Sequence, residues 1–125
     1  MKKVISTTGA PAAIGPYSQA IKINGMLFIS GQIPVDPALG KVVEGGISEQ
    51  TRQSLENIKA ILTEAEYALD NVVKTTCLLS DMAHFKAFNE VYAGYFSHEA
   101  PARATFAVKE LPLGVLVEIE AIAVK

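Results

Sequence analysis

The sequence contains one cysteine, two histidines and no tryptophan, and these shortages exclude several kinds of site. Cys77 alone cannot form a disulfide within the chain, and a thiolate metal cluster needs more than one sulfur ligand. Its neighbours in VVKTTCLL supply no activating charge, so we expect a small buried side chain rather than a reactive nucleophile. His84 and His98 do not have the spacing of metal ligands, so we expect no metal site.

Clusters of basic residues and long apolar runs are also missing. The net charge is −2 and the pI is about 5.6, which argues against a nucleic-acid partner. No segment approaches the ~20 apolar residues that a transmembrane helix needs. The N-terminal stretch MKKVISTTGAPAAIG lacks the unbroken apolar region of a signal peptide. We therefore expect a cytoplasmic protein without membrane contact.

The composition that remains is that of one globular domain spanning residues 1–125. Half of the residues are hydrophobic and 19% are charged, which is enough apolar material for a core. Asn24-Gly25, between the apolar runs 17–23 and 26–30, predicts a β-hairpin that follows a short strand near residues 3–5. A loop rich in glycine and proline, residues 31–46, comes next.

Two amphipathic helices and three strands account for the rest of the chain. Apolar residues recur at threes and fours from Ile47 to Leu69, and Ser48 is the predicted N-cap of this helix. Asp81 is placed to cap a second helix with an aromatic stripe. Strands are expected at 72–79, 103–108 and 115–124. The order β-ββ-α-β-α-ββ indicates an α+β fold, a mixed sheet with both helices on one face.

The last strand suggests what covers the other face of the sheet. One side of this strand is wholly apolar and fits against the helices; it carries Val115, Val117, Ile119, Ala121 and Ala123. The other side carries Leu116, Glu118, Glu120, Ile122 and Val124, which is too apolar for a whole sheet face in water. Because no third helix remains to cover it, the sequence predicts a homo-oligomer with both glutamates at or near an interface.

The strand at 103–108 carries the charge that needs most explanation. By alternation, Arg103 and Thr105 point one way and Ala104, Phe106 and Val108 the other. If the last two strands pair, Arg103 shares the non-helical face with a glutamate. Two interpretations stay open: a structural salt bridge to Glu118 or Glu120, or a planar fork that binds a ligand carboxylate.

Several segments together resemble the RidA/YjgF family of reactive-intermediate deaminases. In chain order they are APAAIGPYSQ (10–19), ISGQIP (29–34), QSLENIKAIL (53–62), VVKTT (72–76), FNEVYAGYF (88–96), PAR (101–103), ELP (110–112) and VEIEAIAV (117–124). They cover nearly the whole chain in the family's order.

The resemblance implies a fold similar to chorismate mutase, a variant of the ferredoxin-like fold, assembled as a homotrimer around an inner barrel with clefts between subunits. It implies hydrolysis of enamine and imine intermediates such as 2-aminoacrylate and 2-aminocrotonate to 2-keto acids and ammonia. The family uses neither a metal nor an organic cofactor. The expected ligands are therefore small 2-imino and 2-keto carboxylates.

The family's site maps onto individual residues of this chain. Arg103 resembles the arginine that binds the substrate carboxylate, and Glu118 resembles the residue that positions or activates water. Thr105 corresponds to a position that contributes backbone groups, and Glu120 has no assigned role. The remaining residues match positions that line the cleft: Tyr17, Ser30, Gly31 and Asn89.

Two positions of this chain depart from the family pattern, and two alternative functions stay open. Glu66 stands where the family commonly has a glycine, so the first helix is expected to end differently or to run longer. Ala104 and Thr105 stand where serine and cysteine are frequent, which should leave activity intact.

One alternative function is a non-catalytic regulator that binds 2-keto acids. The other is an endoribonuclease or translation inhibitor, against which the charge argues.

Overall fold

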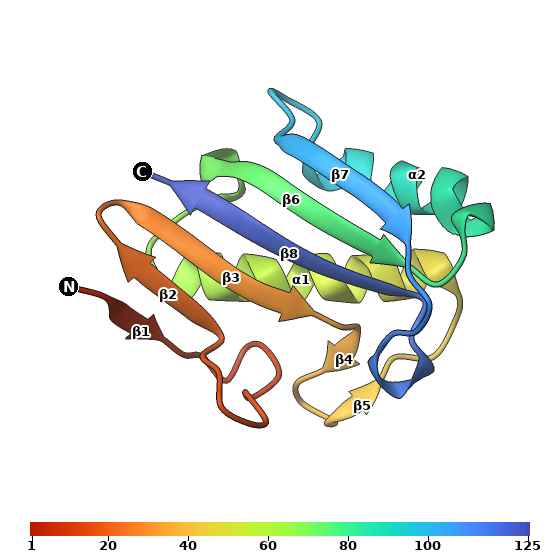
Figure 1. Ribbon diagram of the computed structural model, residues 1–125, viewed down its shortest axis with the longest axis horizontal. Helices are drawn as coiled ribbons and strands as arrows, with labels where there is room; N and C mark the ends of the chain where they lie inside the picture. Colours follow the sequence, from red (N-terminus) through yellow and green to blue (C-terminus); the bar gives the residue numbers. More distant parts are fainter.

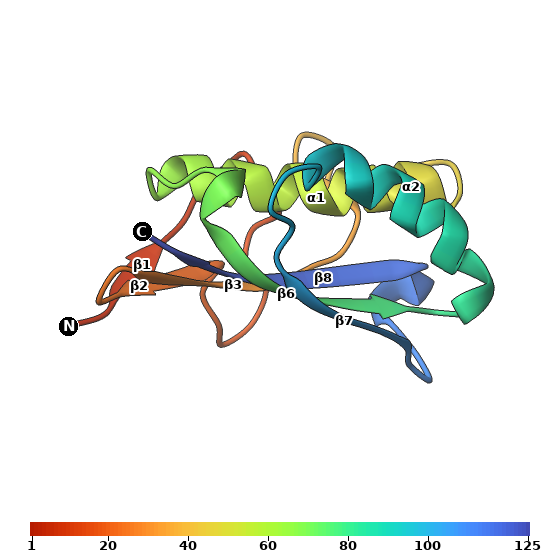
Figure 2. The same cartoon turned by 90° about the horizontal axis from the view of Figure 1, so that it is seen from above.

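The sheet that dominates the computed structural model, which describes residues 1–125, has six strands in the order β1-β2-β3-β8-β6-β7 (Figure 1). The strands are β1 (Lys3–Ile5), β2 (Ala20–Ile23), β3 (Met26–Gln32), β6 (Val72–Leu79), β7 (Ala102–Ala107) and β8 (Val117–Val124). Helices α1 (Ile47–Glu64) and α2 (Phe85–Tyr95) both cover the same face (Figure 2), which confirms the predicted α+β architecture. The minor elements are the hairpin β4 (Val35–Asp36) and β5 (Lys41–Val42) and the 3₁₀ turns Leu69–Asn71, Met82–His84 and Pro112–Gly114. No helix has the length and apolar character needed to cross a bilayer.

The predicted hairpin is confirmed, but its first strand is shorter than expected. Asn24 and Gly25 have φ of 51° and 78°, the left-handed pair that a two-residue β2–β3 turn requires. Strand β2 begins only at Ala20 because the buried Gln19 side chain organises the preceding loop. Its amide donates to the carbonyls of Thr7, Ala10 and Pro11, and its Oε1 accepts the Thr7 N–H at 2.7 Å.

The ends of α1 differ from the prediction. Gly46, not Ser48, is the N-cap, and its N–H donates to Glu49 Oε1 at 2.8 Å. At the other end Glu66 adopts φ 65° although it is not glycine. The N–H of Tyr67 donates to Leu62 O at 2.8 Å, and that of Glu66 donates to Thr63 O at 3.0 Å, the two bonds of a Schellman motif. The helix thus keeps the left-handed ending that the departure from the family pattern was expected to change.

Replacing Glu66 by glycine should therefore stabilise the protein. Glycine adopts a positive φ without the steric cost that a side chain incurs, which is worth about 1 kcal/mol. The free energy of unfolding in urea measures the gain, and Glu64→Gly inside the last helical turn is the matched control, expected to destabilise. A loss of stability in Glu66→Gly would contradict the strain argument.

The last two strands do not pair, so the condition for placing Arg103 beside a glutamate is not met. Strand β6 lies between them: it pairs antiparallel with β8 and parallel with β7. Helix α2 carries the chain from β6 back to the start of a parallel neighbour, so β7 takes the outer edge. The turn at 112–114 then returns the chain into the centre, where β8 fills the place between β3 and β6.

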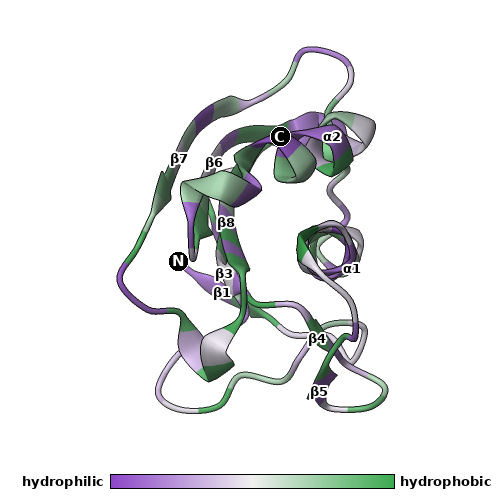
Figure 3. Ribbon diagram, turned by 90° about the vertical axis from the view of Figure 1, so that its right-hand side faces the viewer, coloured by the Kyte–Doolittle hydropathy of each residue, from purple (hydrophilic) through white to green (hydrophobic).

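The core lies between the sheet and the helices, as the alternation in the last strand predicted. Val115, Val117, Ile119, Ala121 and Ala123 are all at most 3% exposed. On the opposite side of the sheet nothing covers the strands (Figure 3). We call this side the open face; it carries Ile21, Phe28, Thr76, Glu118, Glu120 and Ile122, as the strand register places them. Phe28 and Phe106 are 39% and 48% exposed.

Candidate functional site

The residues predicted to form the site fall into two groups on different sides of the sheet. Arg103, Asn89 and Thr105 belong to the outer strand β7 and helix α2; we call them the edge group. Tyr17, Ser30, Gly31 and Glu118 lie along β8, β3 and the loop before β2; we call them the open-face group. Within one chain the two groups do not meet.

The side chain of Arg103 points to the helical side, not to the open face, which corrects the prediction. Arg103 is opposite Thr75 in the parallel β6–β7 register, and Thr75 is completely buried under α2, where its hydroxyl contacts Tyr92 Oη at 2.7 Å. Because residues at matched positions of neighbouring strands share a face, Arg103 follows Thr75. The prediction assumed β8 as the neighbour of β7, and this assumption reversed the face.

Helix α2 holds the guanidinium of Arg103 without neutralising it. Its Nη1 donates to Asn89 Oδ1 at 2.8 Å, and its Cζ lies 4.8 Å from the ring centre of Tyr92. Phe85 and Phe88 approach at 5.6 and 5.8 Å. No carboxylate of the chain forms a salt bridge with Arg103, since the one ion pair is His98–Glu99 at 3.8 Å. The structural salt bridge considered from sequence is therefore absent, and the charge is free to bind an anion.

On the open face, Glu118 is half-buried against the backbone of Gly31. A Cβ placed on Gly31 would overlap the Glu118 carboxylate, with its Cδ only 3.0 Å away. Burial raises the pKa of Glu118, and the neighbouring charge of Glu120 raises it further. Strand β3 has a bulge between Ile29 and Gln32, where it pairs with β8, and this irregularity brings the glycine beneath the glutamate. Such a carboxyl group can accept or relay a proton nearer to neutral pH than an exposed one.

The close approach at Gly31 predicts the effect of adding a methyl group there. In Gly31→Ala the new Cβ should displace the flexible Glu118 carboxylate, lowering about tenfold or more the rate of the imine hydrolysis that the family resemblance implies. Thermal stability should change little, because the displaced end is partly exposed. Gly94→Ala on α2, whose Cβ would meet nothing, is the matched control and should keep full activity. Unchanged activity in Gly31→Ala would show that the position of Glu118 is unimportant.

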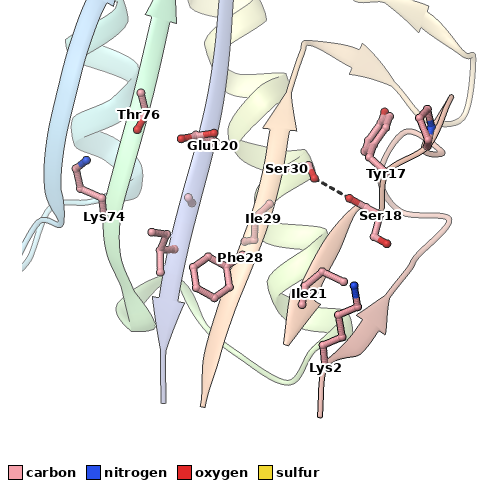
Figure 4. Close-up of a pocket in the computed structure, with 13 residues that line it drawn as sticks. Lys2, Tyr17, Ser18, Ile21, Phe28, Ile29, Ser30, Lys74, Thr76 and Glu120 are labelled. Carbon is pink, nitrogen blue, oxygen red and sulfur yellow. Dashed lines mark hydrogen bonds between the residues drawn. The ribbon is translucent and has the colours of Figure 1, made fainter. Parts of the chain in front are cut away.

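Tyr17 and Ser30 line an open hollow of about 560 Å³ on the open face (Figure 4). The Ser30 hydroxyl donates to Ser18 O at 2.6 Å, which ties β3 to the loop that carries Tyr17. Tyr17 is 52% exposed, and its hydroxyl accepts the Ile14 N–H at 3.3 Å. Glu120 lines the same hollow from β8.

Thr105 and Cys77 lie side by side in the β6–β7 register, on the helical side. The Thr105 hydroxyl is buried and has no hydrogen-bond partner. Because β7 is an edge strand, part of its backbone N–H and C=O groups remains available to a ligand or partner. The Cys77 thiol is fully buried, and desolvation raises its pKa to about 11, so it carries no thiolate at neutral pH, as expected from the sequence.

Three residues that support the edge group and the open-face group were not predicted from the sequence. Gln19 organises the loop of Tyr17, while Tyr92 and Thr75 lie directly behind Arg103. The usable signal was the spacing on α2, where Phe85, Phe88, Asn89 and Tyr92 share one helical face. From the sequence alone, the aromatic residues of this face indicate only an apolar stripe. No group of three or more His, Cys, Asp or Glu side chains is gathered in a metal-binding arrangement.

Residues 7–125 match the family model described as Endoribonuclease L-PSP. A RutC family protein of Pyrococcus horikoshii is 58% identical over 125 residues, covering 100% of this chain and 99% of the relative. The 2-iminobutanoate/2-iminopropanoate deaminase of Mus musculus is 53% identical over 100% of this chain and 93% of its own. Among solved structures, the Rid family protein YyfA of Yersinia pestis superimposes with a TM-score of 0.97 at 50% identity, covering 100% of both chains. TdcF of E. coli with bound serine gives 0.93 at 44% identity, with 98% of each chain covered.

Proposed function

Since this chain belongs to the RidA/YjgF family, which the Endoribonuclease L-PSP model describes, we propose that it hydrolyses small 2-imino acids to 2-keto acids and ammonia. The substrates are of the 2-iminobutanoate and 2-iminopropanoate type, which arise from 2-aminocrotonate and 2-aminoacrylate. Relatives of about 50% identity that are named for this activity support the proposal.

The observation that carries the proposal is the uncompensated charge of Arg103. A guanidinium that is oriented by an amide and aromatic rings, yet lacks a carboxylate partner, is suited to bidentate capture of a small carboxylate. A 2-imino acid has its carboxylate one bond from the reactive carbon. Binding the carboxylate therefore also positions the reactive carbon.

The site is completed between two subunits of a homotrimer. Arg103 on the edge and Glu118 on the open face cannot converge within one chain, because β6 separates their strands and they lie on different sides of the sheet. The exposed apolar side chains of the open face favour burial against further copies of the chain. In this arrangement the edge group of one subunit faces the open-face group of its neighbour, so Tyr17 and Arg103 come from different subunits.

The chemistry needs little beyond orientation and proton transfer. Water adds to the protonated imine carbon while Glu118 accepts a proton from it, giving a carbinolamine. That proton then passes to the nitrogen, which becomes the leaving group. As the C–N bond breaks, the carbinolamine hydroxyl gives its proton to Glu118 and becomes the carbonyl of the 2-keto acid. Ammonia takes this proton up and leaves as ammonium, so the carboxylate is regenerated. Because the protonated imine is already electrophilic, neither redox change nor a covalent intermediate is required.

A coupled assay tests the proposal. A threonine dehydratase generates 2-aminocrotonate, and the appearance of 2-oxobutanoate is followed with and without the protein in the presence of semicarbazide, which traps free imine. We expect more keto acid and less semicarbazone when the protein is present. No acceleration, combined with tight 2-oxobutanoate binding, would instead identify a regulator that binds keto acids. Cleavage of RNA without imine hydrolysis would identify a ribonuclease.

The subunit arrangement has its own test. Light scattering should give three times the chain mass of 13.3 kDa. Mixing inactive Arg103→Ala with inactive Glu118→Gln subunits should restore part of the activity, because some interfaces then combine both intact groups. A monomer, or no restoration on mixing, would overturn the shared site.

A further inference from the structure

The part of the molecule that the proposed chemistry leaves unexplained is the surface behind Arg103. The guanidinium lies against three rings of α2, with Tyr92 closest at 4.8 Å. Two of them belong to a packed series in which Phe88, Tyr92 and Phe96 follow at centroid distances of 5.5 and 4.8 Å. Phe88 and Tyr92 are 0% and 6% exposed, so the part of the surface that they form behind the cation is held in place by packing.

Tyr92 is fixed in a way that Phe88 and Phe96 are not. Its hydroxyl bonds to the hydroxyl of Thr75 at 2.7 Å, and Thr75 is completely buried in strand β6. This bond joins the helix to the sheet directly beneath Arg103, since Thr75 and Arg103 are partners in the β6–β7 register. The angle of the Tyr92 ring is therefore set by the sheet that also carries the arginine.

The rings also decide which side of the guanidinium remains available. Asn89 Oδ1 accepts from one of the five N–H donors, and the rings of Phe85, Phe88 and Tyr92 lie next to the guanidinium. An aromatic face attracts a cation but repels a carboxylate, so an anion approaches the guanidinium from the side away from these rings. A hollow of about 400 Å³ borders that region and is lined by Asn89, Tyr92, Ala93, Phe96, Ala100, Pro101 and Arg103.

We propose that Tyr92, fixed by Thr75, is a positioning residue that orients Arg103 for bidentate binding of the ligand carboxylate. Tyr92 does not itself touch the reacting atoms. The inference rests on the proposed function only for the identity of the ligand, because the orientation of the guanidinium can be measured without catalysis.

The test is a double-mutant cycle on the affinity for 2-oxobutanoate, the stable product, measured by calorimetry on the whole oligomer. Tyr92→Leu removes the ring and should weaken binding about tenfold, the order expected for the loss of one cation–π contact together with the lost orientation. In an Arg103→Ala background the same change should have no further effect, because Tyr92 acts through the arginine. An equal loss in both backgrounds would show a general structural role and overturn the proposal.

Two milder variants test the same positioning role if Tyr92→Leu does not fold. Tyr92→Phe and Thr75→Val each remove one partner of the same hydrogen bond. Each should weaken binding by about threefold, and the double variant should be no weaker, since one bond cannot be lost twice. Tyr95→Phe, also on α2, is the matched control. The Tyr95 hydroxyl donates to Glu56 Oε2 on α1 at 2.6 Å and not to a partner of Arg103, so affinity should not change.

The outcomes separate this inference from the proposed function. If the parent binds 2-oxobutanoate and the cycle behaves as expected but imines are not hydrolysed, the positioning role stands and the function fails. If hydrolysis is observed and neither Tyr92→Leu nor Tyr92→Phe changes affinity, the function stands and the positioning role fails. If the parent binds no 2-oxobutanoate, the positioning role fails, and the coupled assay alone decides the function.

Discussion

Arg103→Ala is expected to lower the rate of imine hydrolysis about 100-fold or more, close to the spontaneous rate. Truncating one partner of a desolvated charge pair costs about 2–5 kcal/mol, and each 1.4 kcal/mol is a factor of ten. The lost interaction is made to the carboxylate both before and during the reaction, so affinity for 2-oxobutanoate should fall with the rate. The coupled dehydratase assay and calorimetry measure the two effects.

The chain offers a matched control in Arg52, its only other arginine, which is exposed on α1. Arg52→Ala should keep full activity and affinity. Stability should be nearly unaffected in Arg103→Ala as well, because the side chain forms no salt bridge and is exposed. An Arg103→Ala variant that folds and retains activity would exclude the arginine as the carboxylate-binding group.

Glu118→Gln should produce the second large effect, a loss of about 100-fold in rate, the lower range for removing a general acid–base group. In contrast to the arginine variant, binding of 2-oxobutanoate should be retained, because the amide preserves the shape of the side chain and a keto acid needs no proton transfer. This separation of binding from rate distinguishes the two roles. Equal loss of binding in both variants would argue against it.

The same substitution should stabilise the fold at neutral pH. The pKa of Glu118 is raised in the folded protein, so the folded state favours the protonated form more than the unfolded state does. This contribution is fully present below the unfolded pKa, which is about 4.3, and is lost as pH rises through the higher folded value. Glu118→Gln should therefore melt at a higher temperature than the parent at pH 7, with the advantage shrinking toward pH 4. A lower melting temperature at pH 7 would contradict the direction of the shift.

The effect of the Glu120 charge on the pKa of Glu118 can be tested. Its charge is the second cause of the raised pKa of Glu118, after burial. Glu120→Gln should thus lower the pKa of Glu118 and move the acid limb of the pH–rate profile to lower pH, with the rate at the plateau kept. A profile that does not move would show that the charge of Glu120 does not reach the site.

The pattern of apolar residues along the chain was sufficient to predict the helices and most of the strands. Alternation in 115–124 correctly separated the buried face from the face of Glu118, because the two-residue period of a strand is local information. The Asn24-Gly25 turn and both helices were predictable for the same reason. The resemblance drawn from eight segments is confirmed at the level of the family.

The order of the strands in the sheet could not be predicted from patterns of neighbouring residues in the sequence. This order determines which residues surround Arg103. The two strands that carry Arg103 and Glu118 follow each other in sequence, which made them the natural pair, but β6 lies between them. Alternation tells which residues of a strand share a side, but not which side faces the helices. That is fixed only when a neighbour such as Thr75 is known.

The sequence by itself thus determined the α+β elements, the buried face of the last strand and the family. Only the tertiary structure decided that Arg103 lies against Tyr92 with no carboxylate partner and that Glu118 lies over Gly31 on the other side of the sheet. The physical reason is that periodicity is a property of neighbouring residues, whereas pairing depends on contacts between strands far apart in the chain.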